Sequence, residues 1–86
     1  MNTIIIDVRE PDEFVQGHVK GAINLPPAAL VEGATALEGI PKQTPIIVYC
    51  RTGSRSNVAK NILARSGFTN ITNGINKEQV EAKYGL

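Results

Sequence analysis

The residues best suited to chemistry form one continuous segment around the only cysteine of this 86-residue chain. The segment reads Cys50-Arg51-Thr52-Gly53-Ser54-Arg55-Ser56. It follows the apolar run 45–49, so Cys50 is expected at the carboxyl end of a buried strand, just before a helix. A helix N-terminus and neighbouring cations favour the thiolate and lower a cysteine pKa from about 8.5 towards 7. We therefore predict that Cys50 is a catalytic nucleophile that needs no separate general base.

The residues after Cys50 are expected to form an anion site. Gly53 can adopt a positive φ and lets several backbone N–H groups converge on one point. An inert, buried cysteine is the alternative, but burying two guanidinium groups without partners would cost several kcal/mol. The predicted substrate-binding residues are Arg51, Thr52, Gly53, Ser54 and Arg55.

The hydrophobic pattern predicts an alternation of strands and helices. We expect strands over residues 3–8, 21–25, 45–49 and 68–72, and helices over 11–16, 28–38, 54–66 and from Asn76 to Gly85. Leu30, Ala34 and Leu37 would share one face of the second helix, and Val58, Ala59, Ile62 and Leu63 one face of the third. Such alternation indicates an α/β domain whose central, mostly parallel sheet of about four short strands is flanked by helices on both faces. Parallel sheets place their sites beyond the carboxyl ends of the strands, where Cys50 falls.

Composition excludes several classes of function. One cysteine and one histidine leave no internal disulfide and no conventional zinc site, so we expect no metal and no cofactor. Residues 1–38 carry a net charge of −4 and residues 39–77 a net charge of +6, although the whole chain has only +1. Near-neutral total charge and few aromatic residues disfavour nucleic acid, and a small anionic substrate suits the basic segment better. No apolar run approaches the length of a membrane span.

Three segments of the chain resemble the sequence signatures of the rhodanese-like sulfurtransferases. These are the Cys50 loop, the run Asp7-Val8-Arg9-Glu10-Pro11-Asp12-Glu13-Phe14, and Gly17-His18-Val19 with Gly21-Ala22-Ile23-Asn24-Leu25-Pro26. Gly67-Phe68 also fits the helix-to-strand turn of that family. In length the chain is most similar to the small single-domain thiosulfate sulfurtransferases of this family. Where members often carry Gly-Gly and then Trp, this chain has Asn73-Gly74-Ile75.

The length of the chain predicts a single domain spanning residues 1–86, and the resemblance implies a rhodanese-like fold for it. The resemblance further implies a sulfane-sulfur donor such as thiosulfate, a persulfide carried on Cys50, and cyanide or a thiol as acceptor. Asp7 and Arg9 are signature residues, which we interpret as a supporting ion pair or a hydrogen bond that anchors the loop. The Ser56 hydroxyl either donates to the sulfur or serves the first turn of the helix. His18 is interpreted as a turn residue rather than a base, and Glu13 as an acid of a first helical turn. We expect a cytoplasmic monomer; a periplasmic form whose leader has been removed is the alternative location.

Two other classes of function compete with this prediction. Phosphatases and arsenate reductases also use a thiolate at a helix N-terminus, but their loops resemble Cys-x5-Arg, whereas Cys50 to Arg55 is Cys-x4-Arg. The shorter ring suits one sulfur atom rather than a tetrahedral phosphate. A persulfide carrier or binding module for one dedicated partner is the non-enzymatic alternative.

Overall fold

The computed structural model describes residues 3–33 and 35–86. Its elements, in chain order, are β1 (Ile4–Asp7), α1 (Pro11–Gln16), β2 (Ile23–Asn24), α2 (Pro27–Val31), the 3-10 helix η1 (Thr35–Leu37), β3 (Ile46–Cys50), α3 (Ser54–Arg65), β4 (Ile71–Asn76) and α4 (Lys77–Tyr84). Within the described residues the strands form one parallel sheet in the order β2-β1-β3-β4. The predicted α/β fold with a parallel sheet of four short strands is confirmed.

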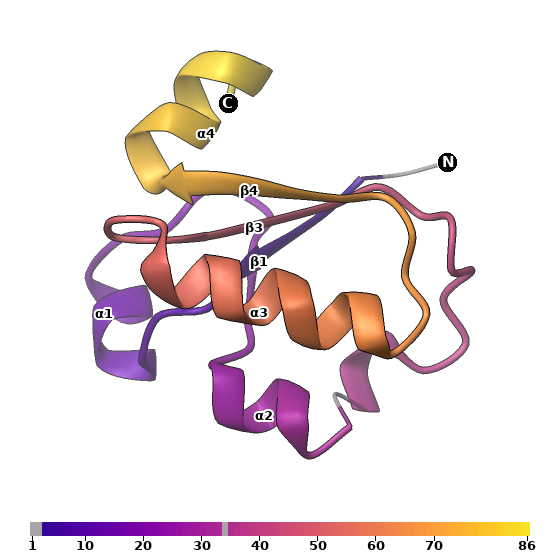
Figure 1. Cartoon of the computed structure of the whole chain (residues 1–86). Coiled ribbons are helices and arrows are strands. Elements are labelled where there is room, and N and C mark those ends of the chain that lie inside the picture. Colours follow the sequence, from indigo (N-terminus) through magenta and orange to yellow (C-terminus); the bar gives the residue numbers. More distant parts are fainter. Residues whose placement is uncertain (1–2, 34) are drawn as a thin grey trace.

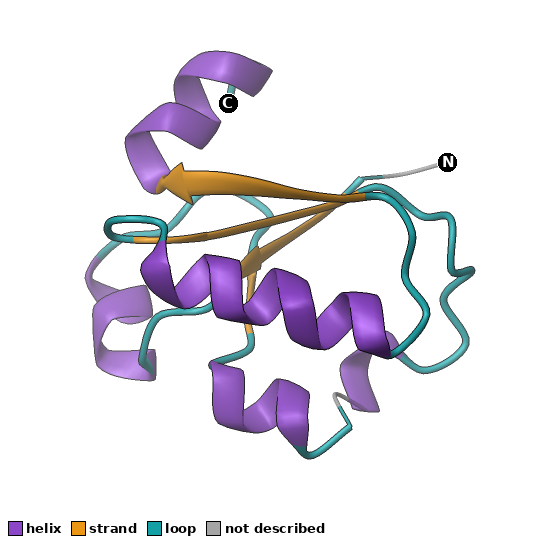
Figure 2. Ribbon diagram, viewed as in Figure 1, coloured by secondary structure: helices purple, strands orange, loops and turns teal. Residues whose placement is uncertain are grey.

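Helices cover both faces of the sheet, as Figures 1 and 2 show, with α2 and α3 on one side and α4 on the other. Side chains alternate along β3: Val48 and Cys50 join the core beneath α3, whereas Ile47 and Tyr49 pack with Val80 of α4. The side chain of Cys50 therefore packs on the α3 side of the sheet, and Cys50 is the last residue of β3. No helix in residues 3–33 or 35–86 has the length and apolar character that crossing a membrane requires.

The helix predicted over 28–38 is wrong in its extent. Helix α2 ends at Val31, Gly33 has a φ of 108°, and a separate 3-10 turn follows at Thr35–Leu37. A left-handed glycine ends the α-helical hydrogen-bond pattern, so Leu30 and Leu37 reach the core from two short pieces rather than one helix. Ala34, assigned to the same helical face, lies outside the described residues.

Two further expectations need correction. The last strand runs from Ile71 to Asn76 rather than over 68–72, because the Phe68 N–H donates to the carbonyl of Leu63 (3.2 Å) and still belongs to the end of α3. Val58 is 51% exposed, since the buried face of α3 consists of Ser56, Ala59 and Leu63. The other predicted elements differ from the observed ones by a few residues at their ends.

A bulge interrupts β4 beside the end of β3. Val48 pairs with Asn73 and Tyr49 with Ile75, so Gly74 is the extra residue. A Cβ on Gly74 would lie 2.5 Å from a methyl group of Val80, which explains why glycine occupies this position. Ile75 has a φ of 76°, an unfavourable conformation for a β-branched residue. The bulge turns this part of β4 towards the Cys50 loop, where a Cβ on Gly53 would meet a methyl group of Ile75 at 3.4 Å.

Candidate active site

The Cys50 loop connects the end of β3 to the start of α3. Cys50 is the last residue of the strand, and Gly53 takes a left-handed conformation (φ 93°) as the N-cap of α3. This conformation folds the backbone back so that the Gly53 N–H donates to Cys50 Sγ at 3.1 Å. The loop geometry predicted from the sequence is therefore present, with Cys50 at the carboxyl end of a central strand.

The surroundings of the sulfur favour its ionised form. Burial by itself raises the pKa of the thiol, but hydrogen bonds from Ser56 (hydroxyl and N–H) and from the N–H groups of Thr52 and Gly53 outweigh it. Together they lower the pKa of Cys50 to about 7. The loop hydrogen bonds are the largest contributions to this lowering, and the Coulomb interaction between Arg55 and the Cys50 thiolate acts in the same direction, as the sequence predicts.

Ser56 links the sulfur to a residue that the sequence interpretation did not include. Its hydroxyl lies 3.5 Å from Cys50 Sγ and donates to Asn73 Oδ1 at 2.7 Å. Asn73 also donates from Nδ2 to the Gly53 carbonyl at 3.1 Å, and its Oδ1 accepts from the Ile75 N–H at 3.0 Å. Asn73 in the bulge of β4 thus holds both ends of the turn that surrounds the sulfur.

The two arginines of the loop have different environments. Arg55 makes a two-pronged ion pair with Glu13 of α1, at 2.7 and 3.1 Å. Arg51 is 71% exposed and approaches the same carboxylate only at 4.0 Å. Hydrogen bonds from Arg55 and then from the Glu10 N–H lower the pKa of Glu13 to about 2. Glu13 was interpreted only as an acid of a first helical turn; it also fastens the Cys50 loop to α1.

Asp7 and Arg9 form the predicted ion pair beside the site. Asp7 is fully buried, accepts from Arg9 Nε and Nη2, and also accepts from the Tyr49 hydroxyl at 2.8 Å. Arg9 Nη2 donates in addition to the Gly17 carbonyl at 2.6 Å. The hydrogen bond with Asp7 raises the pKa of Arg9, which keeps the guanidinium charged. This network fixes the start of α1 relative to the ends of β1 and β3.

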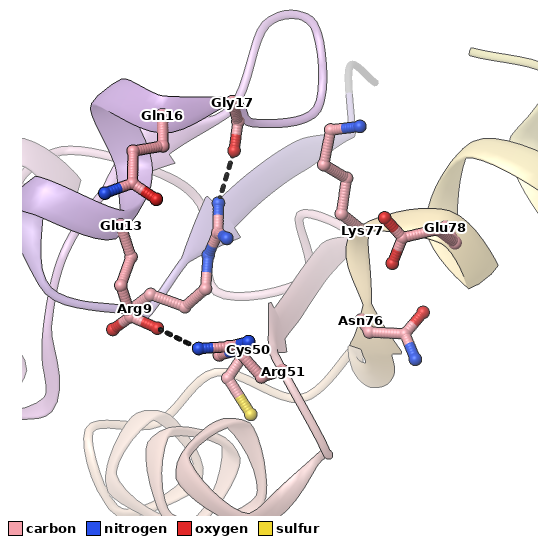
Figure 3. Close-up of a pocket in the computed structure, with 9 residues that line it drawn as sticks. All are labelled: Arg9, Glu13, Gln16, Gly17, Cys50, Arg51, Asn76, Lys77 and Glu78. Carbon is pink, nitrogen blue, oxygen red and sulfur yellow. Dashed lines mark hydrogen bonds and ion pairs between the residues drawn. The ribbon is translucent and has the colours of Figure 1, made fainter.

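An open cavity of about 480 Å³ lies above Cys50. Figure 3 shows Cys50 at one end of it with its sulfur directed towards α3, Glu13 and Gln16 on one side, and residues of α4 on the other. Its lining residues are Arg9, Glu13, Gln16, Gly17, Cys50, Arg51, Asn76, Lys77 and Glu78. The N-terminal turn of α4 was absent from the sequence-based site, because only folding places it beside α1.

The structure brings some of the predicted site residues to the sulfur and leaves others apart. Cys50, Arg9 and Arg51 line the cavity, whereas the hydroxyls of Thr52 and Ser54 lie 3.4 Å from each other on the exposed side of the loop. His18 stacks on Phe14, with ring centroids 3.7 Å apart, and its Nδ1 lies 2.9 Å from the Phe14 carbonyl. In the described part of the chain, no three His, Cys, Asp or Glu side chains cluster as metal ligands would.

Comparison with known proteins agrees with this geometry. The family model described as a rhodanese-like domain matches residues 1–77. The chain belongs to the rhodanese-like family. A solved structure described as a rhodanese with anions from E. coli superposes with a TM-score of 0.80 at 35% identity, covering 91% of each chain. The predicted rhodanese-like fold is therefore confirmed.

Two curated rhodanese-like relatives carry names that refer to activity. A putative mitochondrial thiosulfate sulfurtransferase of Schizosaccharomyces pombe is 39% identical over 84% of this chain. The thiosulfate sulfurtransferase PspE of Escherichia coli is 44% identical over 79% of this chain. The matched regions cover 58% and 64% of the length of these two relatives.

Proposed function

We propose that this rhodanese-like chain is a thiosulfate sulfurtransferase, working as one domain over residues 1–86, that carries sulfur as a persulfide on Cys50. The environment of the Cys50 sulfur is the observation that supports this proposal most. Cys50 Sγ accepts the Gly53 N–H at 3.1 Å and has a pKa of about 7, and Cys50 lines one end of an open cavity. About half of the molecules then hold a thiolate at neutral pH, which is the reactive form.

In the first half-reaction the Cys50 thiolate attacks the outer sulfur of thiosulfate. A bond forms between the two sulfurs, the bond from the outer sulfur to the sulfonate sulfur breaks, and sulfite leaves with the electron pair. Arg51 is mostly exposed at the rim and only weakly paired, so its guanidinium is free to orient the doubly charged donor. The backbone N–H groups of the loop then stabilise the negative charge of the persulfide.

In the second half-reaction an acceptor removes the outer sulfur. Cyanide or a thiolate attacks it, the persulfide S–S bond breaks, and Cys50 leaves as the thiolate from which the cycle began. No oxidant or reductant is consumed, and sulfite departs before the acceptor reacts. We therefore expect double-displacement kinetics with parallel double-reciprocal plots.

Mass spectrometry of the intact protein after incubation with thiosulfate tests this proposal directly. We expect one added sulfur atom, which cyanide then removes as thiocyanate, and neither the adduct nor turnover in Cys50→Ser. Failure of the wild-type protein to gain sulfur would overturn the proposal. A protein that gains sulfur but does not release it to cyanide or small thiols would instead be a carrier for a dedicated partner.

The ion pair of Arg55 with Glu13 disfavours phosphatase chemistry. In a phosphatase-type loop this arginine would grip the phosphate, but here both terminal nitrogens of Arg55 bind Glu13. We expect negligible hydrolysis of p-nitrophenyl phosphate under conditions in which thiosulfate supports turnover.

A further inference from the structure

The cavity above Cys50 is larger than the proposed donor requires. Its volume of about 480 Å³ lies in the range of pockets that bind whole organic ligands, roughly 300–1,000 Å³. Thiosulfate is a small ion that needs only the end of the cavity beside Cys50 and Arg51. The remaining space extends towards Gly17 and the first turn of α4 (Figure 3).

Two cationic side chains from distant parts of the sequence, Arg9 and Lys77, line this far end. Arg9 binds Asp7 through Nε and Nη2 and the Gly17 carbonyl through Nη2, and no hydrogen bond joins its Nη1 to another described residue. Lys77 lies on the same wall, with its Cε 4.0 Å from the position that a Cβ on Gly17 would take. One fixed guanidinium and one flexible ammonium therefore flank the same backbone segment.

The contacts of Lys77 leave it available for a ligand. Its ammonium pairs only with Glu81 one turn along α4, at 3.3 Å, and both side chains are about one-third exposed. Pairs of this kind on a helix surface contribute little to stability, about 0.3–0.5 kcal/mol, so exchange for a ligand carboxylate costs little.

The charges at this end of the cavity are largely balanced by ion pairs. Asp7 neutralises Arg9, and Glu13 is bound by Arg55 on the opposite side of the site. Lys77 becomes available when it leaves Glu81, and Glu78 adds one negative charge at the rim. One exchangeable cation matches a ligand with a single carboxylate rather than a polyanion.

We propose that Arg9 and Lys77 form a carboxylate subsite for the acceptor, so that the physiological acceptor is a small thiol bearing a carboxylate. This inference rests on the proposed sulfurtransferase function. The acceptor's carboxylate would lie between Arg9 and Lys77 while its thiolate attacks the outer sulfur of the Cys50 persulfide. The persulfide S–S bond then breaks, Cys50 leaves as thiolate, and the acceptor departs as its own persulfide.

The test compares two acceptors of similar size and different charge that are long enough to reach across the cavity, 6-mercaptohexanoate and 6-mercaptohexanol, on preformed Cys50 persulfide. In Lys77→Gln we expect kcat/KM for 6-mercaptohexanoate to fall about three- to tenfold. The value for 6-mercaptohexanol should stay within about twofold, because no carboxylate is involved. Each thiol is compared with itself between variants, so differences in thiol pKa cancel. Lys83→Gln, in the last turn of α4 and outside the cavity, is the matched control and should change neither rate.

Measuring the reaction with thiosulfate separately shows whether Lys77 binds the acceptor or the donor. Loading of Cys50 by thiosulfate should be unchanged in Lys77→Gln, whereas Arg51→Ala should raise the KM for thiosulfate. Equal losses for both thiols in Lys77→Gln, or a loss confined to the thiosulfate step, would overturn the acceptor subsite while leaving the sulfurtransferase proposal standing. Absence of any persulfide in the wild-type protein would refute the sulfurtransferase proposal itself.

Discussion

Replacing Ser56 by alanine should raise the pKa of the Cys50 thiol from about 7 to about 8. When Cys50 is a thiol, the single hydroxyl hydrogen of Ser56 is donated to Asn73 Oδ1 at 2.7 Å. When Cys50 ionises, the same hydrogen can turn to the sulfur 3.5 Å away, while Asn73 Oδ1 keeps the Ile75 N–H. Ser56→Ala removes this response and leaves the thiolate with backbone donors alone.

The expected size follows from two opposing hydrogen bonds. A hydrogen bond to a charged group contributes about 1.5–3 kcal/mol, and giving up the neutral bond to Asn73 costs about 0.5–1.5 kcal/mol. The difference is about 1–1.5 kcal/mol, which is about one pKa unit. At pH 7 the thiolate fraction should fall from about one half to about one tenth.

The pH dependence of alkylation by iodoacetamide measures this pKa directly. The rate rises with pH through the pKa of Cys50, so the Ser56→Ala curve should lie about one unit to the alkaline side. The two proteins should react about fivefold differently at pH 7 and equally near pH 10. Ser66→Ala, at the exposed other end of α3, is the control and should follow the wild-type curve. A Ser56→Ala variant with wild-type thermal stability and an unshifted curve would refute the role given to the hydroxyl.

Two further predictions concern stability. Glu13 has its pKa lowered to about 2, so its ion pair should stabilise the fold fully above about pH 4.5 and progressively less as the pH falls towards 2. The melting temperatures of wild type and Glu13→Gln should therefore converge on acidification, with Glu32→Gln as an exposed control; a constant difference between pH 7 and 2 would contradict the assignment. Gly74→Ala should lower the stability by about 1–3 kcal/mol, because its Cβ would lie 2.5 Å from Val80 and 3.0 Å from Ile47. Thermal melts of Gly74→Ala, Val80→Ala and the double variant check this. If the clash with Val80 is the cause, the double variant loses less stability than the two single variants lose together; additive losses would contradict it.

The chemistry of the loop could be predicted because it is local in the sequence. Cys50, Gly53 and Ser56 lie within seven consecutive residues, and the strand before them and the helix after them have clear hydrophobic patterns. The alternation of strands and helices likewise identified the parallel sheet and hence the edge at which the site lies.

The parts of the site that were missed depend on contacts between distant residues. Glu13 and Arg55 are separated by 42 residues, and Asn73 meets Ser56 only because β4 pairs with β3. The bulge at Gly74 cannot be recognised from the hydrophobic pattern, because one extra residue in a short strand only shifts the alternation of inward-facing and outward-facing residues. Asn73 replaces the first glycine of the Gly-Gly-Trp pattern that family members often carry, and this difference was the one sign in the sequence that Asn73 is important.

The direct passage from β4 into α4 has a consequence for redesigning this protein. Asn76 ends the strand and at the same time caps the helix, accepting the Gln79 N–H at 2.9 Å, so no loop separates the two. Asn73, which anchors the Cys50 loop, and Lys77, which lines the cavity, therefore belong to one continuous segment of five residues without an intervening loop. An engineer who grafts a new cavity wall from a homologue must move residues 73–78 as a unit. A graft that begins at residue 77 would combine the wall of one parent with the sulfur support of another, and its reactivity and its choice of acceptor would then change together.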